Sequence, residues 1–128
     1  ILAIELFITK DDKVIVNELA PRPHNSGHYT IEACSFDQFD AHIRGIAGWP
    51  LEQPQLLKPA VMVNVLGQHV APTRALIADH PEWNVHDYCK AEVRHDRKMG
   101  HITVLTDDTA KTVADLEATG CWDDLRKS

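Results

Sequence analysis

Apolar and polar residues alternate over the start of the chain, and this pattern predicts a β-hairpin. Every second side chain of the first stretch is apolar and would share one face of a strand: Leu2, Ile4, Leu6 and Ile8. A polar turn at residues 10–13 separates that stretch from a second β-prone run at residues 14–16. We expect the apolar face to pack against a core, which turns Glu5 towards the opposite face.

A stiff loop and two helical stretches are predicted next. Residues 18–27 contain two prolines, which cannot donate a backbone hydrogen bond and restrict the residues before them. The pattern becomes helical from His28, and Ser35 is a candidate cap for a second helix that Gly48 and Pro50 end. The apolar stripe of that second helix comprises Phe36, Phe39, Ile43, Ile46 and Ala47.

The rest of the chain combines strands and helices. The segment 51–59, which follows Pro50 and contains further prolines, indicates a linker between two parts, residues 1–56 and residues 57–128. The expected strands are residues 60–66, a short one near Val85, and residues 100–106, and the expected helices are residues 71–79 and 107–116. Hairpins mixed with helices in this way predict the α+β class.

Composition excludes several functional classes. The net charge of −6 argues against a broad electrostatic nucleic-acid binder. No apolar run approaches the roughly 20 residues of a membrane span, and no signal peptide is apparent. The three cysteines form no CxxC pair, which favours free thiols over a disulfide framework or a zinc site. The chain begins inside an apolar run without an initiator Met, so we expect it to be part of a longer protein.

Two acidic residues of the predicted hairpin form the first candidate site. Glu5 lies on the first strand, and Glu18 lies near the end of the second, next to the amide of Asn17. A hairpin can bring two such carboxylates together on one face, where a cation such as Mg²⁺ would offset their repulsion. The alternative is that both are solvated surface acids.

The proline-rich loop is the second candidate. Arg22, His24, Asn25 and Ser26 place a guanidinium, an imidazole, an amide and a hydroxyl within a few residues, and Gly27 permits close backbone approach or a positive φ. A helix that starts directly afterwards would favour an anion at its N-terminus. The alternative is an ordinary capped turn.

The third candidate is a basic cluster in an otherwise acidic chain. Residues 90–101 include Lys90, Arg97 and Lys98, which together could bind a phosphate group. The alternative is a solvated run of charges.

Long motifs resemble one known family. Residues 17–33, with the sequence NELAPRPHNSGHYTIEA, closely resemble the signature of the 5-(carboxyamino)imidazole ribonucleotide synthases, the ATPase subunit of phosphoribosylaminoimidazole carboxylase. Residues 60–67 and 97–102 are similar to the same family. The resemblance implies the C-terminal half of an ATP-grasp domain, an antiparallel sheet with helices, followed by a small β-rich C-terminal domain.

The resemblance also implies an activity and residue roles. The family uses ATP and bicarbonate to carboxylate 5-aminoimidazole ribonucleotide in purine synthesis, through carboxyphosphate. Glu5 and Glu18 match its Mg²⁺ ligands, and Asn17 with Glu18 matches its ATP-contacting pair. The resemblance implies that the substrate is bound by Arg22, His24, Asn25 and Ser26, and that Arg22 also acts catalytically by stabilising carboxyphosphate. It implies that the 5′-phosphate is bound by Lys90, Arg97 and Lys98.

The resemblance further implies a cytoplasmic enzyme that forms a homodimer as the full-length protein and binds neither nucleic acid nor membrane. The family's amino-terminal domain and nucleotide-covering lid have no counterpart in this sequence, so we expect the chain alone to be inactive. Two alternatives stay open. One is a formate-using ATP-grasp transferase of purine synthesis, which has a similar Pro-Arg-Pro-His loop but not the Asn-Ser-Gly-His-Tyr continuation. The other is a non-catalytic substrate-binding or dimerisation module.

Overall fold

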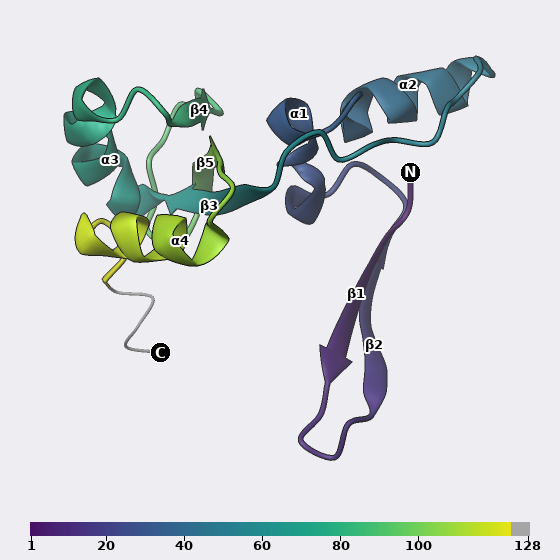
Figure 1. Ribbon diagram of the computed structural model, residues 1–128, viewed down its shortest axis with the longest axis horizontal. Coiled ribbons are helices and arrows are strands. Elements are labelled where there is room, and N and C mark those ends of the chain that lie inside the picture. Colours follow the sequence, from purple (N-terminus) through teal and green to yellow (C-terminus); the bar gives the residue numbers. More distant parts are fainter. Residues whose placement is uncertain (124–128) are drawn as a thin grey trace. The chain divides into compact units, whose positions relative to one another are not determined.

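The computed structural model describes residues 1–123 and divides into two compact units, Ile1–Leu57 and Lys58–Ser128. Helices and antiparallel strands are mixed along the chain, which confirms the α+β class (Figure 1). No helix within residues 1–123 has the length and apolar character needed to cross a membrane.

The first unit contains β1 (Ala3–Ile8), β2 (Val14–Ala20), the 3₁₀ turn η1 (Asn25–Gly27), α1 (Thr30–Ala33) and α2 (Gln38–Ala47). The second unit contains β3 (Ala60–Leu66), η2 (Gly67–His69), α3 (Val70–Leu76), η3 (Ile77–Asp79), β4 (Asn84–Asp87), β5 (Lys98–Leu105) and α4 (Thr109–Ala118).

Strands β1 and β2 form the predicted hairpin, but a β-bulge changes its faces. Glu5 pairs with Glu18 and Leu6 with Val16, so Asn17 is an extra residue without a direct partner. Because the bulge absorbs Asn17, the pairing continues to Ala20, and β2 extends into the segment predicted as a loop.

The prediction that the even-numbered side chains of the first strand face a core is wrong. Ile4, Leu6 and Ile8 are 55%, 53% and 76% exposed, and apolar side chains of β2 are exposed as well. Phe7, on the opposite face of β1, is 57% exposed as well, so large apolar side chains are exposed on both faces of this strand. In addition, the sheet of the hairpin has only two strands, and one stretch of alternating residues cannot show whether another layer covers it.

The cap of helix α2 is a neighbour of the predicted one. Asp37 Oδ1 accepts hydrogen bonds from the amides of Phe39 and Asp40 at 2.7 and 2.9 Å. Ser35, the predicted cap, instead accepts a hydrogen bond from the amide of Gln55 at 3.0 Å. The helix ends as predicted at Gly48, whose φ of +67° is accessible to glycine without strain.

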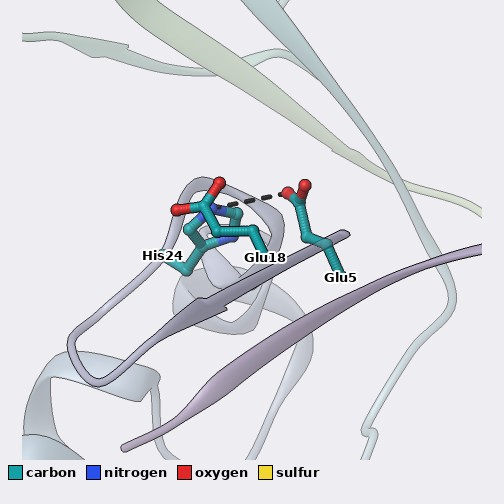
Figure 2. Close-up of side chains that lie close together, drawn as sticks. All are labelled: Glu5, Glu18 and His24. Atoms are coloured by element: carbon teal, nitrogen blue, oxygen red, sulfur yellow. Dashed lines mark ion pairs between the residues drawn. The ribbon is translucent and has the colours of Figure 1, made fainter. Parts of the chain in front are cut away.

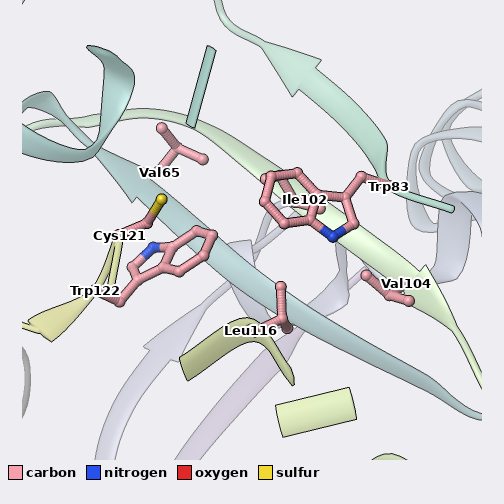
Figure 3. Packing of buried hydrophobic residues seen from close by; sticks show 7 residues of the cluster. All are labelled: Val65, Trp83, Ile102, Val104, Leu116, Cys121 and Trp122. Carbon is pink, nitrogen blue, oxygen red and sulfur yellow. The ribbon is translucent and has the colours of Figure 1, made fainter. Parts of the chain in front are cut away.

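The second unit has a three-stranded antiparallel sheet in the order β3-β5-β4. One face of the sheet and helices α3 and α4 enclose a core that includes Ile102, Leu116 and Trp122 (Figure 3). The indole N–H of Trp122 donates to the carbonyl of Asn64 in β3 at 2.9 Å, so this side chain joins the segment after α4 to the sheet.

Several predicted boundaries shift by a few residues. Strand β5 begins at Lys98 rather than Gly100, because a second bulge lets Lys98 pair with Leu66. Helix α4 begins at Thr109, after Asp108 accepts a hydrogen bond from the amide of Lys111. His80, the residue after η3, stacks on Trp83 with ring centroids 4.1 Å apart.

The position of Trp122 gives a prediction about the stability of the second unit. Trp122→Phe removes the indole donor and part of a buried ring, so we expect the free energy of unfolding to fall by about 2 kcal/mol. Urea unfolding followed through the amide NMR signals of β5 measures this change. Trp49→Phe is the matched control, because Trp49 is 62% exposed and its replacement should change stability by less than about 0.5 kcal/mol. Equal effects of the two variants would contradict the assignment of Trp122 to the core.

Candidate functional site

The carboxylates of Glu5 and Glu18 lie opposite each other across the hairpin, at the β-bulge. The two residues are direct partners in the register, and the bulged Asn17 donates from Nδ2 to Glu5 Oε2 at 3.1 Å. The hairpin therefore brings together the three residues that the sequence singled out on its two strands. Bulges commonly re-aim side chains in this way.

His24 completes the cluster. One ligand atom from each of Glu5, Glu18 and His24 lies within 4.8 Å of the others. Figure 2 shows the two carboxyl groups and the imidazole gathered at one place, with His24 Nε2 3.5 Å from Glu5 Oε1. The His24 side chain is only 11% exposed, whereas that of Glu5 is 40% exposed. Such a set could hold a divalent cation, because carboxylate oxygens suit Mg²⁺ and imidazole suits transition metals.

Arg22 adds positive charge beside the acidic pair. Its guanidinium lies 3.7 Å from Glu18 Oε1, and Nη1 donates to the carbonyl of Pro23 at 3.1 Å. The side chain is 59% exposed, so the ion pair is screened by solvent. Several N–H donors of Arg22 stay accessible for an anion beside the carboxylates.

The loop around His24 is fastened to helix α2 by Gln38, a residue that is 8% exposed. Its side-chain amide accepts from the His24 N–H and donates to the His24 carbonyl, both at 2.8 Å. The same Nε2 lies 2.9 Å from His28 Nδ1. Gly27 leaves the room for this amide, since a Cβ at that position would lie 2.5 Å from Gln38 Oε1. Close approach, rather than a positive φ, is therefore the reason for glycine here.

The other polar side chains of the loop differ in their contacts. Ser26 Oγ lies 2.9 Å from His24 Nδ1, on the side of the ring away from Glu5. Asn25 Oδ1 is buried and has no hydrogen-bond partner within residues 1–123. A buried acceptor without a partner is uncommon in proteins and suits a ligand that can donate to it.

The structure does not support the expected anion site at a helix N-terminus after Gly27. The chain there forms the short turn η1, and α1 has only four residues and no side-chain cap. A single helical turn aligns few peptide dipoles. Anion binding by this loop would therefore depend on its side chains.

The basic cluster lies in the second unit and is partly held by its own loop. Lys90 Nζ donates to the carbonyl of Lys98 at 2.5 Å, and Arg97 Nη1 donates to the carbonyl of Glu92 at 3.3 Å. Arg94 forms an ion pair with Glu92. These contacts place the cationic groups of Lys90 and Arg97 at one loop and leave Arg97 and Lys98 exposed.

Two groups next to this cluster have shifted pKa values. The Arg74 guanidinium, 2.6 Å from Asp87, lowers the pKa of that carboxyl, and the amide of Cys89 contributes in the same direction. Burial raises the pKa of the Tyr88 hydroxyl, which lies 2.9 Å from His101 Nδ1. Asp87 is therefore anionic and Tyr88 neutral at physiological pH.

Sequence reasoning missed two features of the site. It assigned His24 to substrate binding alone, although the ring also faces the carboxylate pair. It did not identify Gln38, which contacts the loop through space from 14 residues further along the chain. A glutamine in the first turn of a helix is common and does not by itself indicate a functional contact. Its contacts with the loop are apparent only in the folded structure.

Sequence models of two domains match the chain. The model of the ATP-grasp domain matches residues 1–39, and that of the phosphoribosylaminoimidazole carboxylase C-terminal domain matches residues 60–115. The N5-carboxyaminoimidazole ribonucleotide synthase of Staphylococcus saprophyticus is 54% identical over 110 residues. That alignment covers 85% of this chain and 29% of the relative.

Solved structures give the same result. The N5-carboxyaminoimidazole synthetase of Staphylococcus aureus, complexed with ADP, matches with a TM-score of 0.86 and 50% identity, over 91% of this chain and 31% of that one. The Aspergillus clavatus N5-carboxyaminoimidazole synthase, in complex with ADP and 5-aminoimidazole ribonucleotide, matches with a TM-score of 0.79 and 34% identity, over 91% and 33%. The chain thus spans less than a third of its bacterial relative from Staphylococcus saprophyticus. On these matches, the chain is homologous to part of the N5-carboxyaminoimidazole ribonucleotide synthases, with one segment similar to the ATP-grasp domain and the other to the phosphoribosylaminoimidazole carboxylase C-terminal domain.

Proposed function

We propose that this chain is the C-terminal part of a ligase that carboxylates 5-aminoimidazole ribonucleotide with ATP and bicarbonate. The reaction passes through carboxyphosphate and gives 5-(carboxyamino)imidazole ribonucleotide. The observation that carries the proposal is the convergence of Glu5, Glu18 and His24 within 4.8 Å, on a segment that matches the ATP-grasp domain. A relative of 34% identity was solved with ADP and the ribonucleotide, which supports the same ligands here.

The acidic pair is the proposed Mg²⁺ site. Glu5 and Glu18 provide carboxylate oxygens, and Mg²⁺ combines one or two carboxylates with phosphate oxygens. When bound, the ion neutralises charge on the ATP phosphates during phosphoryl transfer. Asn17 holds Glu5 through its amide and, with Glu18, contacts ATP in this proposal. Imidazole nitrogen is a poor ligand for Mg²⁺, which leaves the His24 ring for the substrate.

The loop residues are proposed to bind the reacting groups. Arg22, beside Glu18, offers forked donors that stabilise negative charge as bicarbonate takes the γ-phosphoryl group. Asn25 Oδ1 is a buried acceptor that a substrate N–H can satisfy. His24 and Ser26, joined through Nδ1 and Oγ, complete this part of the site.

The basic cluster is proposed to bind the 5′-phosphate of the ribonucleotide. Arg97 and Lys98 are exposed, and Lys90 is held beside the Tyr88 ring with Nζ 5.4 Å from its centroid. A fixed phosphate positions the substrate amine for attack on the activated carboxyl group, which is a proximity effect.

The domain assignment and the assembly are also proposals. We assign residues 1–56 to the C-terminal part of the ATP-grasp domain and residues 57–128 to the small C-terminal domain of the synthase. The division of the chain into units at Leu57 and Lys58 supports this boundary. The whole ligase is proposed to act in the cytoplasm as a homodimer. Because the chain spans 29% of a full-length relative, the adenine contacts are expected from the rest of such a protein.

A chimera tests the proposed activity. This chain would replace its counterpart in the Staphylococcus aureus synthetase, and ADP release would be measured with each substrate omitted in turn. We expect hydrolysis that requires both bicarbonate and the ribonucleotide, and none from the 128-residue chain alone. Substrate-dependent hydrolysis by the isolated chain, or formate replacing bicarbonate in the chimera, would contradict the proposal.

The acidic pair gives a second prediction in the same chimera. Glu18→Gln removes one proposed Mg²⁺ ligand with little change in volume, so we expect kcat to fall by at least about 100-fold. Steady-state kinetics at saturating Mg²⁺ and ATP measures the change. The matched control is Asp11→Asn, which alters an acid in the turn of the same hairpin, paired with Lys13. Unchanged kcat in the Glu18 variant would remove the metal role.

The basic cluster gives a third prediction. Arg97→Ala removes charge-assisted contacts to the substrate phosphate, so we expect the KM for the ribonucleotide to rise by about 10-fold or more. The KM for ATP should stay within about twofold. Lys111→Ala is the control, because Lys111 is an exposed cation of the same unit that pairs with Asp115. A rise of equal size in both variants would indicate a general charge effect instead of a phosphate site.

A further inference from the structure

We infer that Gln38 is a positioning residue for the ligase reaction, because it holds His24 beside the carboxylate pair. This inference rests on the proposed function of that site. Gln38 is the first residue of α2, and its own backbone N–H donates to Thr30 Oγ1, whereas the cap Asp37 bonds the amides of Phe39 and Asp40. Its side chain reaches back to the loop that carries His24.

The side-chain amide of Gln38 satisfies both backbone groups of His24. His24 has an extended backbone, with φ of −127° and ψ of 151°. In an extended residue the N–H and the C=O point the same way, so a single planar amide can pair with both, as a neighbouring strand would. The two distances of 2.8 Å show that this pairing is made. The clamp therefore fixes the peptide groups on both sides of the His24 Cα.

A third contact uses the remaining donor of the amide. Because an amide nitrogen donates and does not accept, the contact of Nε2 with His28 Nδ1 at 2.9 Å makes that ring nitrogen the acceptor. The Gln38 backbone N–H donates to Thr30 Oγ1 at 3.1 Å, and that hydroxyl donates to the carbonyl of Gly27 at 2.6 Å. The start of α2 is thus bonded to both ends of the segment 24–30.

No other side chain can make the same set of bonds. Glutamate has the same length but presents no donor when ionised, so it would face the His24 carbonyl with negative charge. Methionine matches the shape and would leave the partly buried N–H and C=O of His24 without these partners. Asparagine is one methylene shorter. The Gln38 amide also requires glycine at position 27, since the Cβ of any other residue there would clash with it.

The clamp acts on the reaction through the His24 ring. With its backbone held by Gln38 and its Nδ1 beside Ser26 Oγ, the ring presents Nε2 to Glu5. A displacement of about 1 Å in a group that contacts reacting atoms can lower a rate about 100-fold. The expected effect of losing the clamp is therefore on kcat, with ATP binding little affected.

A double-mutant cycle in the chimera tests the inference, with His24→Ala and Gln38→Met as the two changes. The bonds of Gln38 are to the backbone of His24, so His24→Ala removes the ring and keeps the clamp. We expect Gln38→Met to lower kcat at least about tenfold in the parent and to have little further effect in the His24→Ala background. Gln38→Glu, which keeps the shape and one acceptor, should also lower kcat.

The control is Asp37→Ala, which removes the cap of the same helix without touching the loop. It should reduce stability and leave kcat within about twofold. Deuterium exchange at the His24 amide provides a readout independent of activity. The amide should exchange faster in Gln38→Met and stay protected in Asp37→Ala. The exchange rate can be measured in any folded variant, whether or not it is active.

Three results would overturn the inference: additive effects in the cycle, a kcat within about twofold of the parent in both Gln38 variants, or an equal loss of kcat in Asp37→Ala. A parent chimera with no bicarbonate-dependent activity would instead refute the proposed function, which separates the two failures.

Discussion

The site depends on the placement of two like charges at the bulge of a hairpin. Carboxylates directly opposite each other in an antiparallel pair destabilise the sheet. Around Glu5 and Glu18 the structure supplies an amide donor from Asn17, a guanidinium from Arg22 and an imidazole from His24. Each of these groups reduces the repulsion. A cation between the two carboxylates, as in the proposed Mg²⁺ site, would reduce it further.

The sequence predicts the outline of the fold because its signals are local. Strand β3 and the end of α2 follow from a β-prone run and from Gly48, whose conformation glycine adopts without strain. The exposure of the β1 side chains could not be predicted, because alternation does not show whether another layer covers a two-stranded sheet. The bulge at Asn17 could not be predicted either, because it depends on the pairing with the partner strand. The cap of α2 was misplaced because Ser35 and Asp37 are both suitable caps, and Ser35 is engaged by the amide of Gln55 instead.

The distinction between local signals and tertiary contacts also explains which residues of the candidate site could be predicted. The sequence indicates its charged members, because Glu5 and Glu18 fall on two paired strands and Arg22 lies between two prolines, and the family resemblance then suggests their roles. The residue that holds the loop in place, Gln38, could not be predicted from the sequence. Gln38 is an ordinary residue in a helix, and its importance comes from an extended backbone 14 residues earlier that presents two groups in one direction. Positioning contacts of this kind depend on three-dimensional complementarity and leave no pattern in the chain.

The shortness of the helices near the loop determines how an anion can be held there. The four residues of α1 sum too few dipoles for a strong positive end, and the one longer helix of this unit begins with Asp37 in its capping position. The N–H groups at the start of α2 are used by Asp37 and Thr30, so they are not free for a ligand. In the proposed reaction, charge stabilisation would then come from side chains such as Arg22 and from the proposed Mg²⁺. This requirement explains why the orientation of the loop matters, because a side-chain site keeps its geometry only while the backbone beneath it is fixed.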